Sequence, residues 1–178
     1  MRYEHFVRAK DSLRILLCPP MNRRFQRWVT VDDLNDTGLG YVAAACKKAG
    51  ADVTLLSWNV NLRMEDFQRK LLELRPHVVG IKVFTTLFKG THETLHCIRE
   101  TLPDAITLIG GPHPSTSCPE DLFVEFEGLL DYALAGEGEY GIAALIEKIR
   151  TAGNKPQEGS DTDNPLITFD EIESQCKV

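Results

Sequence analysis

Two glycines, a proline and a histidine, at residues 110–113, come directly after the apolar run at residues 106–109. Such a run predicts a short buried strand, which the glycines and prolines then end. Because glycine has no Cβ, the main chain there can approach a bulky ligand to contact distance, or adopt torsions that other residues avoid. These residues therefore indicate either a ligand-binding loop at a strand end or a tight turn into the next helix.

Three further loops of unusual composition follow apolar runs that we interpret as strands. Pro19 and Pro20 open a connection much longer than the roughly 2–6 residues usual in such units, which is typical of a functional loop or a mobile surface loop. The hydroxyls of Thr85 and Thr86 either contact a ligand or cap a helix. Residues 136–139, Gly-Glu-Gly-Glu, open a helix whose free amides favour a polar or anionic group. Together these loops predict one large ligand across one edge of a sheet.

The elements that must position these loops alternate between apolar strands and amphipathic helices. The predicted strands are residues 13–18, 52–57, 78–84, 106–109 and 132–135. The apolar stripes that predict the helices are Leu39, Val42, Ala43 and Cys46; Met64, Phe67, Leu71 and Leu74; Leu95, Ile98 and Leu102; Leu122, Phe123 and Phe126; and Ile142, Leu145, Ile146 and Ile149. Gly50 is expected to end the first helix, and Arg99 and Glu100 are expected to face outward from the third.

Five strand–helix units predict an α/β fold, in which helices cover both faces of a doubly wound, five-stranded parallel sheet. We expect the flavodoxin-like (Rossmann-type) strand order 2-1-3-4-5, with the ligand at the carboxyl ends of the strands. Residues 13–151 are predicted to form this domain, after an N-terminal extension at 1–12. Residues 152–178 are predicted to be a polar linker and tail, in which residues 166–178 add a strand, add a short helix or hang free.

Composition places the 178-residue chain among ordinary globular proteins, with 43% hydrophobic and 26% charged residues. The formal charge of -6 argues against a nucleic-acid surface. No apolar run approaches the roughly 20 residues of a membrane span, and the polar first residues do not form a secretory signal. The five cysteines are scattered, with no zinc or iron–sulfur spacing, which is typical of reduced thiols and predicts a cytoplasmic protein.

The combination of strand-end motifs resembles the N-terminal cobalamin-binding domain of cobalamin-dependent radical SAM enzymes. The motifs that carry the resemblance are Leu-Cys-Pro-Pro at 17–20, Gly-Leu-Gly-Tyr at 38–41, Val-Gly-Ile at 79–81, Gly-Gly-Pro-His at 110–113 and Gly-Glu-Gly-Glu at 136–139. The resemblance implies that cobalamin lies on the carboxyl ends of the strands, with its nucleotide tail beside strands one, three and four. The cofactor-binding residues that it implies are Pro19, Pro20, Leu39, Gly40, Thr85, Thr86, Leu87, Gly110, Gly111, Pro112, His113, Gly136, Glu137 and Gly138.

The resemblance also implies roles for parts of this set. Residues 85–87 are expected to flank the tail, residues 110–111 to make room for it, and residues 136–138 to line the far wall. Glu137 and Glu139 are expected to be exposed carboxylates, polar contacts or anchors at a domain interface, and no residue is assigned a catalytic role.

Two differences between this sequence and the motifs of related domains limit what the resemblance implies. Domains that bind cobalt through a histidine carry Asp-x-His-x-x-Gly after strand one, whereas this chain has Pro-Pro-Met-Asn there and no histidine between Phe6 and Pro76. We therefore expect base-off cobalamin without a histidine ligand, and His113 as a tail contact or turn residue. The Cys-x-x-x-Cys-x-x-Cys motif of a 4Fe-4S cluster does not occur in the sequence. S-adenosylmethionine and the cluster are accordingly expected in a radical SAM domain, in cis or in trans, of an enzyme that transfers a methyl group.

Three other functions remain open. A response-regulator receiver shares the strand order, but it needs an acidic cluster after strand one and an Asp at the end of strand three, where this chain has Cys18-Pro19 and Phe84-Thr85. A flavin- or nucleotide-binding enzyme would carry a phosphate loop rich in glycine and threonine at the position of the double proline. An interaction module that kept the fold and lost cofactor binding is the third alternative.

Overall fold

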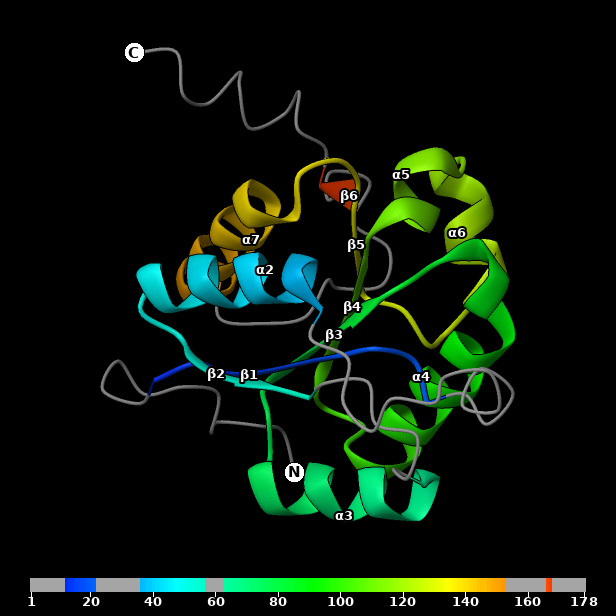
Figure 1. The fold of residues 1–178 in the computed structure, drawn as a ribbon, viewed down its shortest axis with the longest axis horizontal. Helices are drawn as coiled ribbons and strands as arrows, with labels where there is room; N and C mark the ends of the chain where they lie inside the picture. The colour runs from blue at the N-terminus through cyan, green and yellow to red at the C-terminus, as the bar shows by residue number, and fades with distance from the viewer. Residues whose placement is uncertain (1–11, 22–35, 57–62, 153–165, 168–178) are drawn as a thin grey trace.

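A parallel β-sheet lies between two layers of helices (Figure 1). The computed structural model describes residues 12–21, 36–56, 63–152 and 166–167. The strands are β1 (Arg14–Cys18), β2 (Asp52–Leu55), β3 (Val78–Lys82), β4 (Ile106–Gly110), β5 (Tyr132–Leu134) and β6 (Leu166–Ile167). The helices are α2 (Thr37–Lys48), α3 (Met64–Leu74), the 3-10 turn η1 (Thr85–Leu87), α4 (Phe88–Thr101), α5 (Pro112–Thr116), α6 (Pro119–Glu125) and α7 (Gly138–Ala152).

The sheet has the order β2-β1-β3-β4-β5-β6, with parallel pairing throughout. The flavodoxin-like order predicted for the first five strands is therefore confirmed. The two residues of β6 add a short strand beside β5, in the segment whose structure the sequence left open. Residues 22–35, in the long connection after β1, lie outside the described residues, as do most of the predicted N-terminal extension and C-terminal linker.

Each face of the sheet has its own hydrophobic core, because successive side chains of a strand point to opposite sides. Ile15 and Leu17 of β1 pack with α2 and α7, whereas Leu16 packs on the face that carries α3, α4 and α6 (Figure 1). A strand buried on both faces reads as a continuous apolar run, which is why the sequence predicted these strands. The helix stripes are confirmed by their buried members, which are Leu39, Ala43, Cys46, Phe67, Leu71, Leu95, Ile98, Leu122, Phe126, Ile142, Leu145, Ile146 and Ile149.

Helix α2 begins and ends at recognisable capping residues. The Asp36 side chain accepts a hydrogen bond of 3.0 Å from the backbone N–H of Leu39, as an N-cap does. After Lys48, Gly50 takes a φ of +80°, a torsion that side-chain-bearing residues rarely adopt, so the prediction that it stops the helix is confirmed. This cap fixes where the first turn of α2 stands above the sheet.

Arg99 of α4 does not face outward, so that prediction is wrong, although Glu100 is exposed. The Arg99 guanidinium donates to the Thr107 hydroxyl at 3.0 Å and to the Leu129 carbonyl at 3.1 Å, and it pairs with Asp131 at 3.0 Å. The arginine turns inward because these loop groups at the amino ends of β4 and β5 need donors that the strand ladder does not supply. It thereby ties α4 to the end of the sheet opposite the predicted ligand-binding edge.

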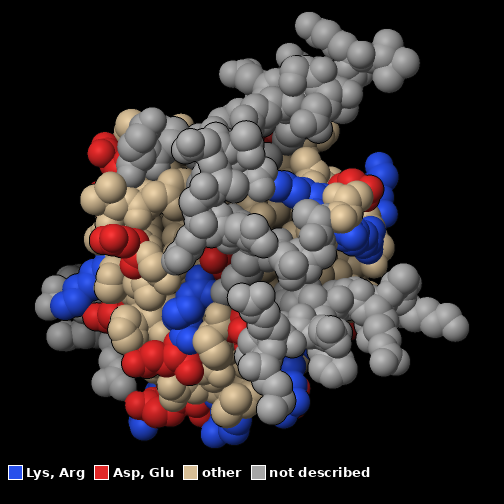
Figure 2. Space-filling model, turned by 180° about the vertical axis from the view of Figure 1, so that it is seen from behind, with Lys and Arg blue, Asp and Glu red and all other residues tan. Residues whose placement is uncertain are grey.

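The described surface carries charges of both signs. On the face shown in Figure 2, acidic and basic side chains are interspersed over the lower part of the molecule. Among the helices that the structure describes, none has the length and apolar character needed to cross a bilayer.

Candidate functional site

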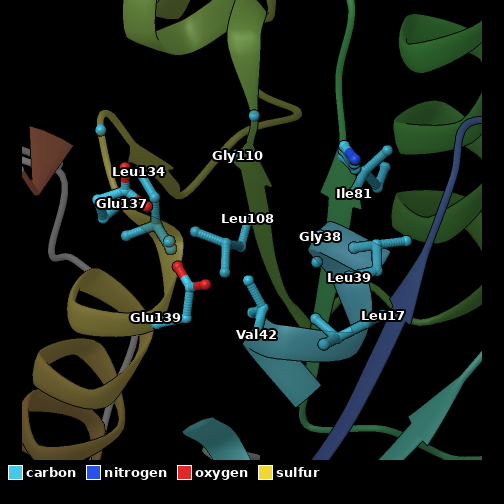
Figure 3. Close-up of a pocket in the computed structure, with 15 residues that line it drawn as sticks. Leu17, Gly38, Leu39, Val42, Ile81, Leu108, Gly110, Leu134, Glu137 and Glu139 are labelled. Carbon is cyan, nitrogen blue, oxygen red and sulfur yellow. The ribbon is translucent and has the colours of Figure 1, made fainter. Parts of the chain in front are cut away.

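The floor of a pocket lies at the carboxyl ends of four neighbouring strands (Figure 3). Leu17, Gly80, Leu108 and Leu134 come from β1, β3, β4 and β5, and they lie on the face that carries α2 and α7. A Cβ placed on Gly80 would lie only 2.7 Å from Leu17 Cδ2 and 3.5 Å from Leu108 Cδ2. Glycine at this position therefore keeps the floor low between two leucines.

The first turns of two helices form opposite walls above this floor. Leu39 and Val42 belong to α2, and residues 136–139 lead into α7 (Figure 3). A Cβ on Gly138 would lie 3.0 Å from Val42 Cγ2. The absence of a side chain at Gly138 therefore lets the first turns of α2 and α7 approach each other closely. The cavity has a volume of about 190 Å³. Its lining residues are Leu17, Gly38, Leu39, Val42, Gly80, Ile81, Lys82, Leu108, Gly110, Gly111, Leu134, Gly136, Glu137, Gly138 and Glu139.

The paired glycines after β4 differ in their surroundings. A Cβ on Gly110 would meet only Leu134 Cβ, at 3.8 Å, which is an ordinary contact. Gly111 has φ +102° and ψ -165°, in a region that is essentially restricted to glycine, and a Cβ there would lie 3.1 Å from the Val83 carbonyl oxygen. Gly110 therefore leaves space in the pocket, whereas Gly111 turns the chain into α5.

Charged side chains stand on two sides of the pocket. On the β3 side, Lys82 Nζ lies 2.7 Å from Asp36 Oδ1, with the side chains 21% and 8% exposed. On the α7 side stand Glu137 and Glu139, and Figure 3 shows the Glu139 carboxylate directed toward Leu108 and Val42. Charged side chains therefore border the apolar floor on two sides, with Lys82 on one side and Glu137 and Glu139 on the other.

The structure brings together part of the predicted set of cofactor-binding residues. The predicted residues that line the pocket are Leu39, Gly110, Gly111, Gly136, Glu137 and Gly138. The predicted residues that do not line it are Pro19, Pro20, Gly40, Thr85, Thr86, Leu87, Pro112 and His113. Most of the second group still lies at the carboxyl edge of the sheet, in the segments that follow β1, β3 and β4.

The short helix α5 connects the loops that follow three strands. His113 Nδ1 lies 3.2 Å from the Thr85 hydroxyl, which joins α5 to the turn after β3. Ser115 donates to the Gly111 carbonyl and accepts from the Gly136 N–H at 3.0 Å, which joins α5 to the loop after β5. Helix α5 therefore holds the edge of the sheet together beside the pocket, although the predicted elements did not include it.

The segment that contains Pro19 and Pro20 leads away from the pocket, toward the opposite face of the sheet. Pro19 and Pro20 are buried, and the next residue, Met21, donates its N–H to the Thr94 hydroxyl of α4 at 2.8 Å, on the opposite face of the sheet. Burial raises the pKa of the preceding Cys18 thiol to about 12, so this thiol stays protonated at neutral pH. Among the described residues, no cluster of three or more His, Cys, Asp or Glu side chains could hold a metal ion.

Several lining residues were not in the predicted set of cofactor-binding residues, namely Leu17, Gly38, Val42, Gly80, Ile81, Lys82, Leu108, Leu134 and Glu139. Two signals could have found some of them. The alternation of strand residues places Leu17, Leu108 and Leu134 on one face, and Lys82 is a charged residue that ends an otherwise apolar strand. The remaining lining residues could not be found in this way, because the packing of distant segments decides where α2 and α7 leave a cavity.

Comparison with known families decides the class of this domain. Residues 29–146, more than half of the chain, match the family described as the B12 binding domain. The chain belongs to the B12-binding domain family.

Curated relatives of this B12-binding domain are much longer proteins. Hopanoid C-3 methylase of Methylococcus capsulatus is 34% identical over 68% of this chain and 23% of its own length. Anaerobic magnesium-protoporphyrin IX monomethyl ester cyclase of Rubrivivax gelatinosus is 29% identical over 62% of this chain and 20% of its own length. Cytidylyl-2-hydroxyethylphosphonate methyltransferase of Streptomyces wedmorensis is 28% identical over 63% of this chain and 24% of its own length. The chain therefore spans less than a quarter of each relative.

Solved structures share the fold of this B12-binding domain. The cobalamin-dependent S-adenosylmethionine radical enzyme OxsB, with aqua-cobalamin and S-adenosylmethionine bound, matches with a TM-score of 0.67 and 23% identity over 79% of this chain and 19% of OxsB. A response regulator from Thermotoga maritima matches with a TM-score of 0.50 and 14% identity over 79% of this chain and 96% of its own. The family match confirms the resemblance to cobalamin-binding domains, and the match to OxsB shows that the fold is shared with the corresponding part of a radical SAM enzyme.

Proposed function

We propose that this chain binds cobalamin, with the nucleotide tail in the pocket between α2 and α7 and the corrin ring at the carboxyl ends of the strands. The observation that carries the proposal is the open cavity of about 190 Å³ at the ends of β1, β3, β4 and β5. Ligands of doubly wound sheets bind at this edge, where the strand order reverses. The family match makes cobalamin the ligand to test first.

The chemistry of the pocket fits such a tail. Its base is flat and apolar on its faces, and the floor offers Leu17, Leu108 and Leu134 around Gly80, with no side chain at Gly80 to fill the space. The sugar and phosphate are polar, and charged side chains border the floor on two sides of the pocket. The domain that binds the cofactor is proposed to be residues 13–151, flanked by an N-terminal extension and a C-terminal linker.

We also propose that cobalamin is bound base-off, without a histidine on cobalt. The His113 residue is 7% exposed, and its Nδ1 lies 3.2 and 3.4 Å from the hydroxyls of Thr85 and Ser117. Its Nε2 is buried and lies 3.7 Å from the Glu125 carboxylate. These contacts hold the imidazole inside the protein, so His113 supports the loop at the strand ends rather than serving as a cobalt ligand.

The proposed role of the chain is to carry the cofactor for a radical SAM methyltransferase. Bound cobalamin would supply a cobalt centre that carries the methyl group, while the residues of this chain bind and orient the cofactor. Two relatives whose names specify methyl transfer support this reaction. A radical SAM domain, in the same chain or in a partner, would supply S-adenosylmethionine and the 4Fe-4S cluster.

Binding to hydroxocobalamin tests the function. Purified protein should retain about one equivalent through gel filtration, because the tail fills a slot rather than an open surface, and the absorption spectrum should be that of base-off cobalamin. A colourless protein would refute cofactor binding and favour an interaction module. A base-on spectrum would refute the placement of the tail.

A pair of valine substitutions, one inside the pocket and one outside it, tests the proposed position of the tail. Gly110→Val should reduce retention at least tenfold, because its methyl groups enter the cavity while the backbone tolerates a side chain. Ala143→Val makes a similar change on the exposed side of α7 and should bind normally. Circular dichroism should show the same fold for both variants. Equal retention by both would contradict the proposed position of the tail.

A further inference from the structure

Lys82 stands where a charged residue is unexpected, at the end of an apolar strand and inside the pocket lining. It follows Gly80 by two residues, so both lie on the same face of β3, with Gly80 at the floor and Lys82 closer to the mouth. Among the described residues that line the pocket, Lys82 is the one with a basic side chain. Within this described lining, positive charge is therefore confined to the β3 side.

Two contacts and the space left by a glycine hold the ammonium group at the mouth. Its Nζ lies 2.7 Å from Asp36 Oδ1 and 5.2 Å from the centroid of the Phe84 ring. A Cβ on Gly38 would lie 2.9 Å from Nζ, so the absence of a side chain at Gly38 lets the ammonium approach the first turn of α2. A lysine that is oriented in this way loses less freedom when it binds a ligand than one that extends into solvent.

The ion pair leaves hydrogen-bonding capacity for a ligand. An ammonium group has three N–H donors, and within the described part of the chain the hydrogen bond of Lys82 goes to Asp36. Asp36 also has a structural role, because the same carboxylate oxygen accepts a hydrogen bond from the Leu39 N–H at the start of α2. Because the desolvation of two buried charges offsets most of their attraction, a buried ion pair adds little net stability, and the pair itself does not account for a lysine in a ligand pocket.

The opposite wall determines which ligand group would face Lys82. Glu137 and Glu139 line the α7 side, and their negative charges disfavour an anion there. The leucines and Gly80 of the floor suit an uncharged, flat group. An anionic group at the mouth is therefore directed to the β3 side, where Lys82 can donate charge-assisted hydrogen bonds to it.

We propose that Lys82 binds the phosphodiester of the nucleotide tail and makes the pocket selective for corrinoids that carry a phosphate. The inference rests on the proposed function and adds a specificity-determining residue to it. In this arrangement Asp36 holds the ammonium in place and caps α2, and it does not contact the ligand.

Two ligands test the inference, namely hydroxocobalamin and a cobinamide, which keeps the corrin ring but lacks the phosphate, the sugar and the base. Binding is measured by absorbance titration of the full chain. Lys82→Met should weaken hydroxocobalamin binding about tenfold, because a charge-assisted hydrogen bond is lost, and leave cobinamide binding unchanged. Lys82→Arg should keep most of the affinity. Equal losses for both corrinoids, or no loss with hydroxocobalamin, would overturn the inference.

A variant of the partner residue separates ligand binding from a structural role. Asp36→Asn removes the carboxylate but keeps a good N-cap, so α2 should begin at the same place. If Lys82 binds phosphate, this variant should bind hydroxocobalamin as tightly as the wild type or more tightly, because the amide oxygen can still accept the Lys82 hydrogen bond while the competing negative charge is gone. If Asp36→Asn weakens binding as Lys82→Met does, the pair is structural and the inference is wrong. Failure of the wild type to bind hydroxocobalamin would overturn the proposed function as well.

Discussion

Gly110 and Gly111 are adjacent in sequence, but the structure requires glycine at them for different reasons. Gly111 needs glycine for its backbone, because its φ of +102° and ψ of -165° are closed to residues with a Cβ. Gly110 has no such torsion, and a Cβ there would make only an ordinary contact. The sequence motif thus combines a requirement of the fold with a requirement of the pocket.

Alanine at each glycine should separate these two requirements. Gly111→Ala should lower the free energy of unfolding by about 1–3 kcal/mol, because the new Cβ strains the backbone and lies 3.1 Å from the Val83 carbonyl oxygen. Gly110→Ala should change it by less than about 0.5 kcal/mol. Urea denaturation followed by circular dichroism measures the unfolding free energy of both variants. Equal losses of stability would contradict the different roles assigned to the two glycines.

At the scale of elements, opposite ends of the sheet serve different purposes. At the carboxyl ends, the first turns of α2 and α7 line the pocket, and α5 lies beside it. At the amino ends of β4 and β5, Arg99 of α4 joins the loops through Thr107, Leu129 and Asp131. The hydrogen bonds of this network satisfy loop groups away from the pocket, so we expect the network to support stability rather than ligand binding.

Removal of Arg99 tests this division. Arg99→Met should cost about 2–4 kcal/mol of unfolding free energy, because it removes the cation that faces the largely buried Asp131 carboxylate. The control is Arg69→Met, which breaks the exposed pair with Asp66 and should cost less than about 1 kcal/mol. Thermal or urea unfolding gives both values. At temperatures where the variants are folded, cobalamin affinity should not change, and a selective loss of affinity would refute the division.

For the whole molecule, the fold by itself does not identify the ligand. The same sheet is found in OxsB and in a response regulator, with TM-scores of 0.67 and 0.50. What distinguishes this chain is the combination of its family match with a pocket between α2 and α7. Function in this fold depends on the strand ends, as is usual for a fold shared by many activities.

Ligand binding should therefore stabilise the whole domain. Hydroxocobalamin at a free concentration of one hundred times its dissociation constant should add about 2.7 kcal/mol to the unfolding free energy, because only the folded state has the pocket. Differential scanning calorimetry should show a rise in the unfolding temperature for the wild type. At the same ligand concentration, Gly110→Val should show a much smaller rise. Equal rises for both proteins would indicate binding elsewhere on the molecule.

The sequence by itself determined the five main strands, their order and most of the helices, and it predicted the segments at the edge where we propose that cobalamin binds. Apolar runs, helical stripes and glycine or proline stops are local patterns, and few topologies can bury them all. Tertiary structure decided which side chains meet. Lys82 and Asp36 pair across 46 positions of the chain, and Gly80 lines the floor because of the leucines on neighbouring strands. Such contacts depend on the packing of distant segments, which local sequence patterns do not encode.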